Sequence, residues 1–326
     1  MIELKYPLFD GEKVWDGATV AIEDGAITSV TACPAEECGE GFLMPGLIDA
    51  HTHMETMAQV ASLLKSGITA TCDVDGSQSL IRASRQLHII SSAGMAMGMV
   101  VNPEGFVERA VENGARYIKA LLFSPLSIGK PALRGIVRAA HARGLKVAVH
   151  ATQVATVRQA VDAGADILLH VPMKEEYPAE LAATIAERGI AVAPTLVMME
   201  TFATSRRNGY IPEHYRNAEN AVRLLHESGV RILAATDANS GSFAPAVAFG
   251  STLHREMALL ARAGLSPVEV LASATGRIAE VFGIDDIGAI RAGKRADLLL
   301  IDGRPDRNMA DTSRIRQIWI DGKAIE

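Results

Sequence analysis

Eight short apolar runs alternate with amphipathic stretches between residue 43 and about residue 240, and this alternation narrows the choice of fold more than any other feature. The runs are LMPGLIDA, GITATCDV, GMAMGMVV, ARYIKALL, LKVAVHA, ADILLHV, GIAVAPTL and VRILAATDA. Runs of this length are typical of strands buried on both faces of a parallel sheet, and the stretches between them have helical spacing. The order of strands and helices therefore predicts an α/β protein built from βα units.

Glycines mark the ends of several predicted helices. Gly144, Gly164, Gly189 and Gly229 each stand where a helical stretch gives way to an apolar run. A left-handed residue is needed at that position, and glycine adopts it without a steric cost. Eight βα units that close on themselves form a TIM-type (β/α)8 barrel of about 250 residues. A doubly wound open sheet is the alternative, but the sequence has neither a GxGxxG loop nor a Walker-type loop to bind a nucleotide.

Both ends of the chain resemble strands of a different kind. Short alternating segments flank Asp-Gly pairs at residues 10–11 and 24–25, and the pattern returns at 302–303 and 321–322. Asp-Gly is a strong signal for a tight turn between antiparallel strands. Neither end holds enough apolar residues for its own core, so we expect the two to pair. The prediction is a small discontinuous β-sandwich domain, residues 1–43 and 285–326, beside a barrel at 44–284.

Composition excludes several classes of partner. The chain has 326 residues and a net charge of −6 without a basic cluster, which argues against nucleic acid as a partner. No apolar stretch approaches the roughly 18 residues of a membrane span, and the start lacks the order of a secretory signal. Cys33, Cys38 and Cys72 are too few and too loosely spaced for a disulfide framework or a zinc pair. We expect a cytoplasmic protein that does not bind membranes.

The first apolar run ends in two histidines separated by one residue, His51 and His53. In an extended chain, residues i and i+2 point to the same face, so both imidazoles can bind one metal ion. The carboxyl end of a barrel strand is also where barrel enzymes keep their catalytic groups. The alternative is a pair of loop histidines with no ligand role.

Four later runs contain a titratable residue in their second half: Lys119, His150, His170 and Asp237. Each has an ordinary structural explanation, such as a buried core histidine, a lysine that extends to solvent or a helix cap. A barrel, however, brings all its strand ends to one mouth, where these groups would meet. Imidazole and carboxylate ligands suit zinc or a similar divalent ion.

These motifs resemble those of the amidohydrolase superfamily of binuclear metal hydrolases, nearest to its imidazolonepropionase-like and Xaa-Pro dipeptidase-like branch. The resemblance covers nearly the whole chain. It rests on PGLIDAHTH, GITATCDVDG, YIKALLFSP, AAHARGLKVAVHA, VDAGADILLHV, IAVAPTL, ATDA and the tail AIRAGKRADLLLIDG. The tail relates the small domain to that family's composite β-sandwich.

The resemblance implies a ligand set for two divalent ions, with zinc the best candidate. His51, His53 and Asp237 would hold one ion, His150 and His170 the second, and Lys119, carboxylated by carbon dioxide, would bridge them. An unmodified lysine is a cation and cannot bridge two cations, whereas a carbamate supplies two anionic oxygens. The bridging water would become hydroxide near neutral pH and attack a carbonyl, with Asp237 as the proton shuttle.

Two departures from the family narrow the chemistry. Deaminase branches carry a carboxylate three residues after the histidine of the fifth strand, where this chain has Gln153, and an amide cannot shuttle protons. Dipeptidase-like relatives carry a tyrosine where this chain has Thr152, and their loop after the first strand is longer. Deamination and the cleavage of acidic dipeptides are therefore disfavoured.

Several residues are candidates for substrate contact. Met54, Phe123 and Met173 follow predicted strands and would line a pocket for an uncharged or hydrophobic group, although core packing is the alternative for each. Arg206 and Arg207 lie in the segment SRRNGYIPEHY, which suits a mobile lid and would anchor substrate.

We therefore expect a metal-dependent amidohydrolase that cleaves a small amide, cyclic amide or ester. Three alternatives stay open: a lactone or ester hydrolase on the same metals, a mononuclear deaminase, and a barrel that binds metal without catalysis. The expected partner is a small-molecule substrate, and assembly into a homo-oligomer is left open.

Overall fold

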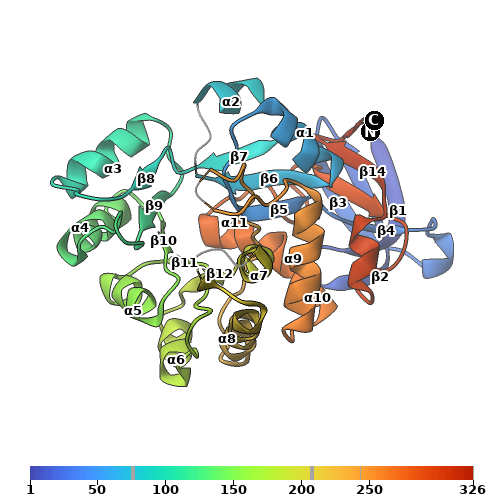
Figure 1. The fold of residues 1–326 in the computed structure, drawn as a ribbon. Helices are drawn as coiled ribbons and strands as arrows, with labels where there is room; N and C mark the ends of the chain where they lie inside the picture. The colour runs from blue at the N-terminus through green and yellow to red at the C-terminus, as the bar shows by residue number, and fades with distance from the viewer. Residues whose placement is uncertain (75–77, 206–208, 243, 326) are drawn as a thin grey trace.

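The computed structural model describes residues 1–74, 78–205, 209–242 and 244–325. Two parts are visible in Figure 1: a ring of parallel strands wrapped by helices, and a mixed sheet at the right that contains both ends of the chain. This arrangement is the predicted TIM-type barrel with a small sheet domain. Among the described residues, no helix has the length and apolar character needed to cross a membrane.

Two parallel sheets form most of the barrel wall. The first contains β5 (Leu47–Thr52), β6 (Ile68–Asp73) and β7 (His88–Ser91); the second contains β8 (Met95–Ala96), β9 (Ile118–Leu121), β10 (Val147–His150), β11 (Ile167–Leu169) and β12 (Ala191–Ala193). Small and branched side chains such as Ile48, Ala70, Ala148 and Leu169 fill the interior. Every second residue of a strand points inward, so the apolar runs supply this core directly.

The predicted eighth strand is a closing segment without regular strand structure. Single bridges join Ile232 to Val192 of β12 and Ala238 to Thr52 of β5, and the N–H of Ala50 donates to the carbonyl of Ala234 at 3.0 Å. Within this segment the N–H of Thr236 donates to the side chain of Asp49 instead of to a neighbouring strand, while the N–H of Asp237 donates to the carbonyl of His51 at 2.9 Å. The segment still completes the ring between β12 and β5.

The third strand lies earlier in the chain than predicted. The prediction placed it at residues 94–101, but β7 begins at residue 88 and β8 contains only two residues. Residues 97–101 lie outside regular strand structure, and the side chain of Met99 is 90% exposed. The prediction therefore holds for Met95 and Ala96 and was wrong for residues 97–101, where the apolar run forms surface rather than a buried strand.

Helices cover the outside of the barrel. They are α1 (Met57–Lys65), α2 (Gln78–Ala83), α3 (Pro103–Glu112), α4 (Lys130–His141), α5 (Val154–Ala163), α6 (Ala179–Glu187), α7 (Leu196–Ser205), α8 (Tyr215–Glu227), α9 (Ser251–Arg262), α10 (Pro267–Ser273) and α11 (Gly276–Phe282). The four glycines predicted at helix ends have left-handed φ values of 70°, 87°, 65° and 82°, in chain order. The glycine signals therefore placed the turns into β10, β11, β12 and the closing segment correctly.

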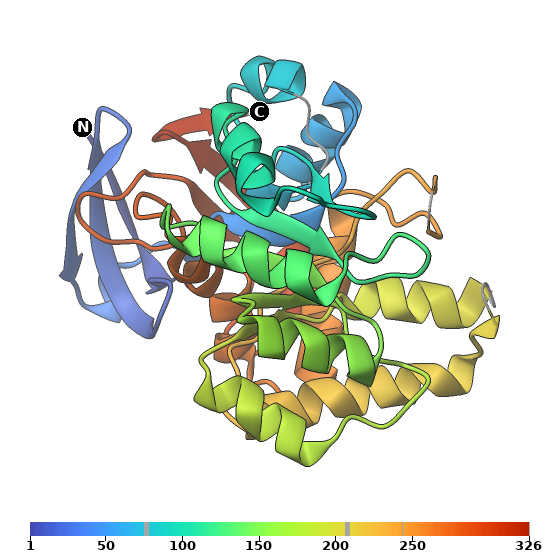
Figure 2. The ribbon, with the colours of Figure 1, turned by 90° about the vertical axis from the view of Figure 1, so that its left-hand side faces the viewer.

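Both ends of the chain pair in one seven-stranded sheet, in the order β15-β14-β13-β4-β1-β2-β3. The strands are β1 (Ile2–Phe9), β2 (Val14–Glu23), β3 (Ala26–Ala32), β4 (Phe42–Pro45), β13 (Leu298–Ile301), β14 (Ile315–Ile320) and β15 (Lys323–Ile325). Two-residue turns at 24–25 and 321–322 have positive φ at both positions, as tight hairpins require. Figure 2 shows the first three strands standing to one side of the helices.

Candidate metal centre

The carboxyl ends of the barrel strands bring the predicted ligands together. His51 lies in β5, Lys119 in β9 and His150 at the end of β10, while His170 follows β11 directly. The side chains of His51, Lys119 and His170 are at most 3% exposed. Residues from four separate strands therefore meet at the barrel mouth.

Asp237 is the centre of this cluster. Its Oδ1 lies 3.2 Å from Nε2 of His51 and 3.1 Å from Nε2 of His53, and its Oδ2 lies 4.0 Å from Nδ1 of His170. His51, His170 and Asp237 each offer a ligand atom within 4.8 Å of the others. Three imidazoles thus surround one carboxylate in a shielded position.

The remaining two candidates, Lys119 and His150, adjoin the same cluster. Nζ of Lys119 lies 3.4 Å from Nε2 of His51. The ring centroids of His150 and His170 are 4.4 Å apart, and those of His51 and His170 are 5.4 Å apart. All six residues that the sequence placed at strand ends therefore lie in one group.

Two of these ligands have a strained backbone. His170 has a φ of 71° and Asp237 a φ of 57°, in the left-handed region that non-glycine residues seldom adopt. Such strain costs roughly 1–3 kcal/mol per residue and persists only where the surroundings enforce it. Here it turns an imidazole and a carboxylate away from the direction of the strand and toward the mouth.

Burial sets the charge of the cluster. Burial, followed by the charge of Lys119, lowers the pKa of His51 to about 3 and that of His150 to about 3. Burial and His150 hold the pKa of His170 well below its usual range. For Asp237, the neighbouring imidazoles outweigh burial and keep its pKa below the usual range. At neutral pH these three imidazoles are therefore neutral and the carboxylate is ionised, which is the state that metal ligands need.

The donor set fits a divalent metal. Nε2 of His150 and Nδ1 of His51 are buried and have no hydrogen-bond partner among the described residues. A buried nitrogen without a partner costs free energy, unless it accepts a metal through its lone pair. Neutral imidazoles beside one ionised carboxylate are typical zinc ligands.

Two residues that sequence reasoning missed hold the ligands in place. Nδ1 of His170 lies 2.8 Å from the hydroxyl of Thr195, a buried residue with a φ of 52°. Asp49 accepts hydrogen bonds from the N–H of His51 and from both the N–H and the hydroxyl of Thr236. Asp49 therefore joins the segments that carry His51 and Asp237. Its position two residues before His51 on the same strand was the available signal.

A third residue that the sequence did not predict is Glu256 of α9, which contacts the backbone next to Thr195 rather than a candidate ligand itself. Its carboxylate is fully buried and accepts hydrogen bonds from the N–H groups of Leu196 and Val197, at 3.0 and 2.7 Å. These are the first two residues of α7, directly after Thr195. Burial raises the pKa of Glu256 to about 8, although both hydrogen bonds oppose the shift. No sequence signal distinguishes this glutamate from those on helix surfaces.

The raised pKa of Glu256 predicts a pH-dependent stability. In the unfolded chain Glu256 releases its proton above a pKa of about 4.5, whereas in the folded chain it keeps the proton up to a pKa of about 8. The free energy of unfolding therefore falls as the pH rises between these two values. Glu256→Gln is neutral throughout. We expect the variant to lose less stability than the wild type between about pH 5 and pH 8, measured by urea unfolding. Parallel pH profiles for the two proteins would contradict this, and Glu187→Gln on the exposed surface of α6 is the control.

The predicted substrate contacts lie in different surroundings. The side chain of Phe123 is 49% exposed, and its ring centroid lies 5.7 Å from that of His150. Met54 and Met173 are almost fully buried in the main hydrophobic core. Arg206 and Arg207 lie outside the described residues. Of this group, Phe123 is the residue that offers free surface beside the cluster.

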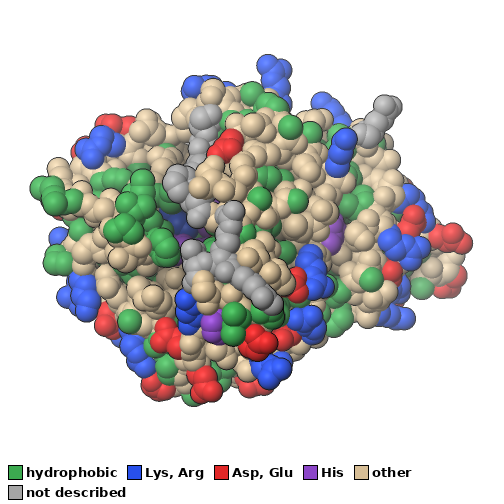
Figure 3. Space-filling view, viewed as in Figure 1, with side chains coloured by type: hydrophobic (Ala, Val, Ile, Leu, Met, Phe, Trp, Pro, Cys, Tyr) green, Lys and Arg blue, Asp and Glu red, His purple; other side chains and the backbone are tan. Residues whose placement is uncertain are grey.

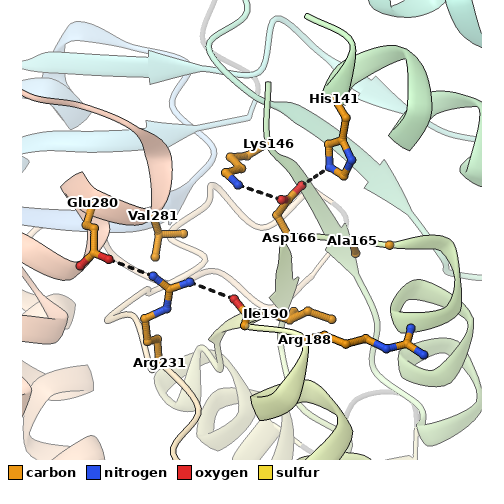
Figure 4. Close-up of a pocket in the computed structure, with 11 residues that line it drawn as sticks. His141, Lys146, Ala165, Asp166, Arg188, Ile190, Arg231, Glu280 and Val281 are labelled. Atoms are coloured by element: carbon orange, nitrogen blue, oxygen red, sulfur yellow. Dashed lines mark hydrogen bonds and ion pairs between the residues drawn. The ribbon is translucent and has the colours of Figure 1, made fainter. Parts of the chain in front are cut away.

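A separate pocket of about 310 Å³ lies at the other end of the strands (Figure 4). Lys146, Asp166 and Arg231 line it, and each precedes the strand or closing segment that it adjoins. Most of its charged groups pair with one another: Asp166 contacts Lys146 at 3.0 Å and His141 at 2.8 Å, and Arg231 contacts Glu280 at 3.1 Å. This pocket holds none of the predicted ligands.

Imidazoles and a carboxylate at the carboxyl ends of parallel barrel strands are typical of metal-dependent barrel hydrolases. Comparisons with known proteins agree, because a model of the amidohydrolase family matches residues 42–325. The chain belongs to the amidohydrolase family. It is a hydrolase that acts on carbon–nitrogen bonds, which confirms the family and the enzyme class predicted from the sequence.

Individual relatives are distant. An uncharacterized protein of Mycobacterium bovis is 26% identical over 302 residues, which cover 78% of each chain. An imidazolonepropionase of Deinococcus radiodurans is 25% identical over 294 residues, covering 82% of this chain and 68% of that protein. The solved structure of a Xaa-Pro dipeptidase with bound methionine has a TM-score of 0.83 at 20% identity and covers 99% of both chains. This structural likeness shows a shared fold.

Proposed function

We propose that the protein hydrolyses a small amide, cyclic amide or related ester at the barrel mouth, with Asp237 as the proton shuttle. The observation that carries the proposal is the position of the Asp237 carboxylate, which lies within 3.2 Å of two imidazoles and has a strained backbone that directs it to the mouth. Two divalent ions, held by the six clustered residues with Lys119 carboxylated, would supply the activated water and polarise the carbonyl.

The residues of the chain account for the movement of the proton. In amide hydrolysis the oxygen of water bonds to the acyl carbon, the carbon–nitrogen bond breaks, and a proton passes from water to the leaving nitrogen. Asp237 is ionised, so it can accept that proton and return it to the leaving group. The contacts of Oδ1 with Nε2 of His51 and of His53, at 3.2 and 3.1 Å, hold the carboxylate in place for both transfers.

Hydrolysis is favoured over deamination by Gln153. This residue stands three positions after His150, directly before α5, and carries an amide in place of the carboxylate that a deaminase would use. Asp237 would then be the group that moves the proton from water to the leaving nitrogen, and one such carboxylate is enough for hydrolysis at a carbonyl.

The test is a hydrolysis screen with the metal content measured on the same preparation. N-acyl amino acids, cyclic imides, carbamates and lactones are offered to the protein with added zinc. We expect turnover of at least one amide, its loss after treatment with a chelator, and its recovery when zinc returns. Turnover of lactones alone would support the ester alternative, and release of ammonia from an aminated ring would support deamination. Turnover that a chelator leaves unchanged would contradict the proposal.

A further inference from the structure

Exposed apolar side chains lie beside the barrel mouth. Phe123, Leu126, Met97, Met99 and Val101 are 49%, 44%, 47%, 90% and 84% exposed. They come from two segments that follow neighbouring parallel strands, β9 and β8. Figure 3 shows apolar side chains gathered over the region of α3, β8 and β9, with a histidine side chain visible in the hollow beside them. Side chains this large are seldom grouped on a surface without a function.

The two segments are joined to each other and to the metal centre. The N–H of Gly98 donates to the carbonyl of Leu126 at 2.7 Å, which links the segment after β8 to the segment after β9. At the inner end, the edge of the Phe123 ring meets the ring of His150 at a centroid distance of 5.7 Å. The apolar surface therefore begins beside a candidate metal ligand. Neither segment carries a charged side chain at residues 97–101 or 122–128.

The outer part of this surface is a groove of about 380 Å³. Its lining includes Met95, Met97, Met99, Val101, Phe106 and Arg109. None of the described residues that line it is acidic, and Arg109 supplies its single charge. Methionine side chains are unbranched and adaptable, so they accommodate flexible apolar chains of different lengths.

We propose that this apolar groove binds an extended apolar arm of the substrate, so that the enzyme prefers amides carrying such an arm to small polar amides. The inference rests on the proposed function, because the reacting carbonyl would lie beside His150 and Asp237. The arm would then pass over Phe123 and lie along Met97 and Met99.

The position of the groove favours substrate over a protein partner. A second copy of the chain seated on Phe123 would also cover the mouth beside His150, and it would block access to the reacting groups. A substrate arm uses the same surface and leaves the reaction in place. Phe123 lies beside His150, and Met97 and Met99 line the groove. The hydrogen bond from Gly98 to Leu126 joins the two segments that carry these side chains. A partner protein would not require an apolar surface that starts next to a candidate metal ligand.

The experiment measures kcat/KM for p-nitroanilides of unbranched acids from acetyl to dodecanoyl, and for N-acetyl alkylamides of increasing length. We expect kcat/KM in one series to rise about two- to fourfold per added methylene until the groove is filled, since each buried methylene is worth about 0.8 kcal/mol. The double variant Met97→Gln/Met99→Gln should reduce the preference for dodecanoyl over acetyl by roughly tenfold or more. Met57→Gln is the control, because Met57 is 46% exposed but lines no part of the groove.

Binding of dodecanoate, measured by calorimetry, provides a readout that does not depend on turnover. We expect the double variant to bind it at least about tenfold more weakly than the wild type or Met57→Gln. Flat length dependence in both series, or equal dodecanoate binding by wild type and double variant, would overturn the inference while the proposed hydrolysis stands. Absence of turnover with normal dodecanoate binding would instead count against the proposed function. A dimer that the double variant dissociates would assign the groove to a second copy and overturn the inference.

Discussion

Replacing Lys119 with alanine is expected to lower kcat/KM by about a thousandfold or more and, if the proposed centre holds two ions, to reduce the metal content from two ions per chain to one. Lys119 is 1% exposed and its Nζ lies 3.4 Å from Nε2 of His51. Alanine leaves a buried gap at this position and has no group that could carry the bridging negative charge. Metal ions contribute several kcal/mol to reactions of this kind, and each 1.36 kcal/mol is a tenfold change in rate. Steady-state kinetics and metal analysis on the same sample measure both effects.

Lys146→Ala is the matched control, because Lys146 lies at the opposite end of the barrel in a surface contact with Asp166. We expect it to keep wild-type activity and metal content. Carbon-13 NMR after exchange with labelled bicarbonate should show a carbamate signal in the wild type that is absent from Lys119→Ala. Unchanged turnover in Lys119→Ala would show that this lysine does not bridge metals.

Replacing Asp237 with asparagine is expected to lower kcat by roughly 10²–10⁴-fold, which is the usual contribution of a positioned proton-transfer group. Asparagine has nearly the same shape but cannot accept and return a proton. The loss should appear in kcat more than in KM, because the substrate arm is bound elsewhere. Steady-state kinetics over a range of substrate concentrations separates the two parameters.

Asp166→Asn is the control for this variant. Asp166 also contacts an imidazole, at 2.8 Å from His141, but it lies in the pocket at the other end of the strands. We expect its activity to match the wild type. If Asp237→Asn retains full kcat with full metal occupancy, then Asp237 is not the proton shuttle and another group must carry the proton.

Much of the barrel follows from local sequence signals. Gly144, Gly164, Gly189 and Gly229 mark helix ends because only glycine adopts the left-handed conformation freely, and the structure has that conformation at each. His51 and His53 could be assigned to one face because alternate residues of a strand share a face. The gathering of His150, His170 and Asp237 follows from barrel geometry, which brings distant strand ends to one mouth.

The parts that the sequence did not predict depend on contacts between distant segments. The N–H of Thr236 donates to the carboxylate of Asp49, 187 residues away, instead of to a neighbouring strand. The support of His170 requires Thr195, whose neighbours are held by Glu256 of a later helix. A pattern of apolar residues does not predict which side chain will form a hydrogen bond with which distant backbone group.

The apolar run at residues 94–101 misled the prediction for a different reason. Met97, Met99 and Val101 have the composition of a buried strand, yet they are exposed beside the mouth. An apolar sequence pattern is typical of residues that are shielded from water. Residues of a core and residues of a surface that binds an apolar molecule are both shielded in this way, so their composition is the same. A mistaken strand can therefore indicate a binding surface.

The position of β4 affects the order in which the protein can be assembled during synthesis. This strand lies between β1, which is synthesised before the barrel, and β13, which is synthesised after it. One of its edges must wait unpaired on the ribosome while the whole barrel is synthesised, and pairing of such distant segments is slow. The strands that follow the barrel therefore complete the sheet, and a nascent chain released before residue 298 would leave one edge of β4 exposed to pairing with other proteins.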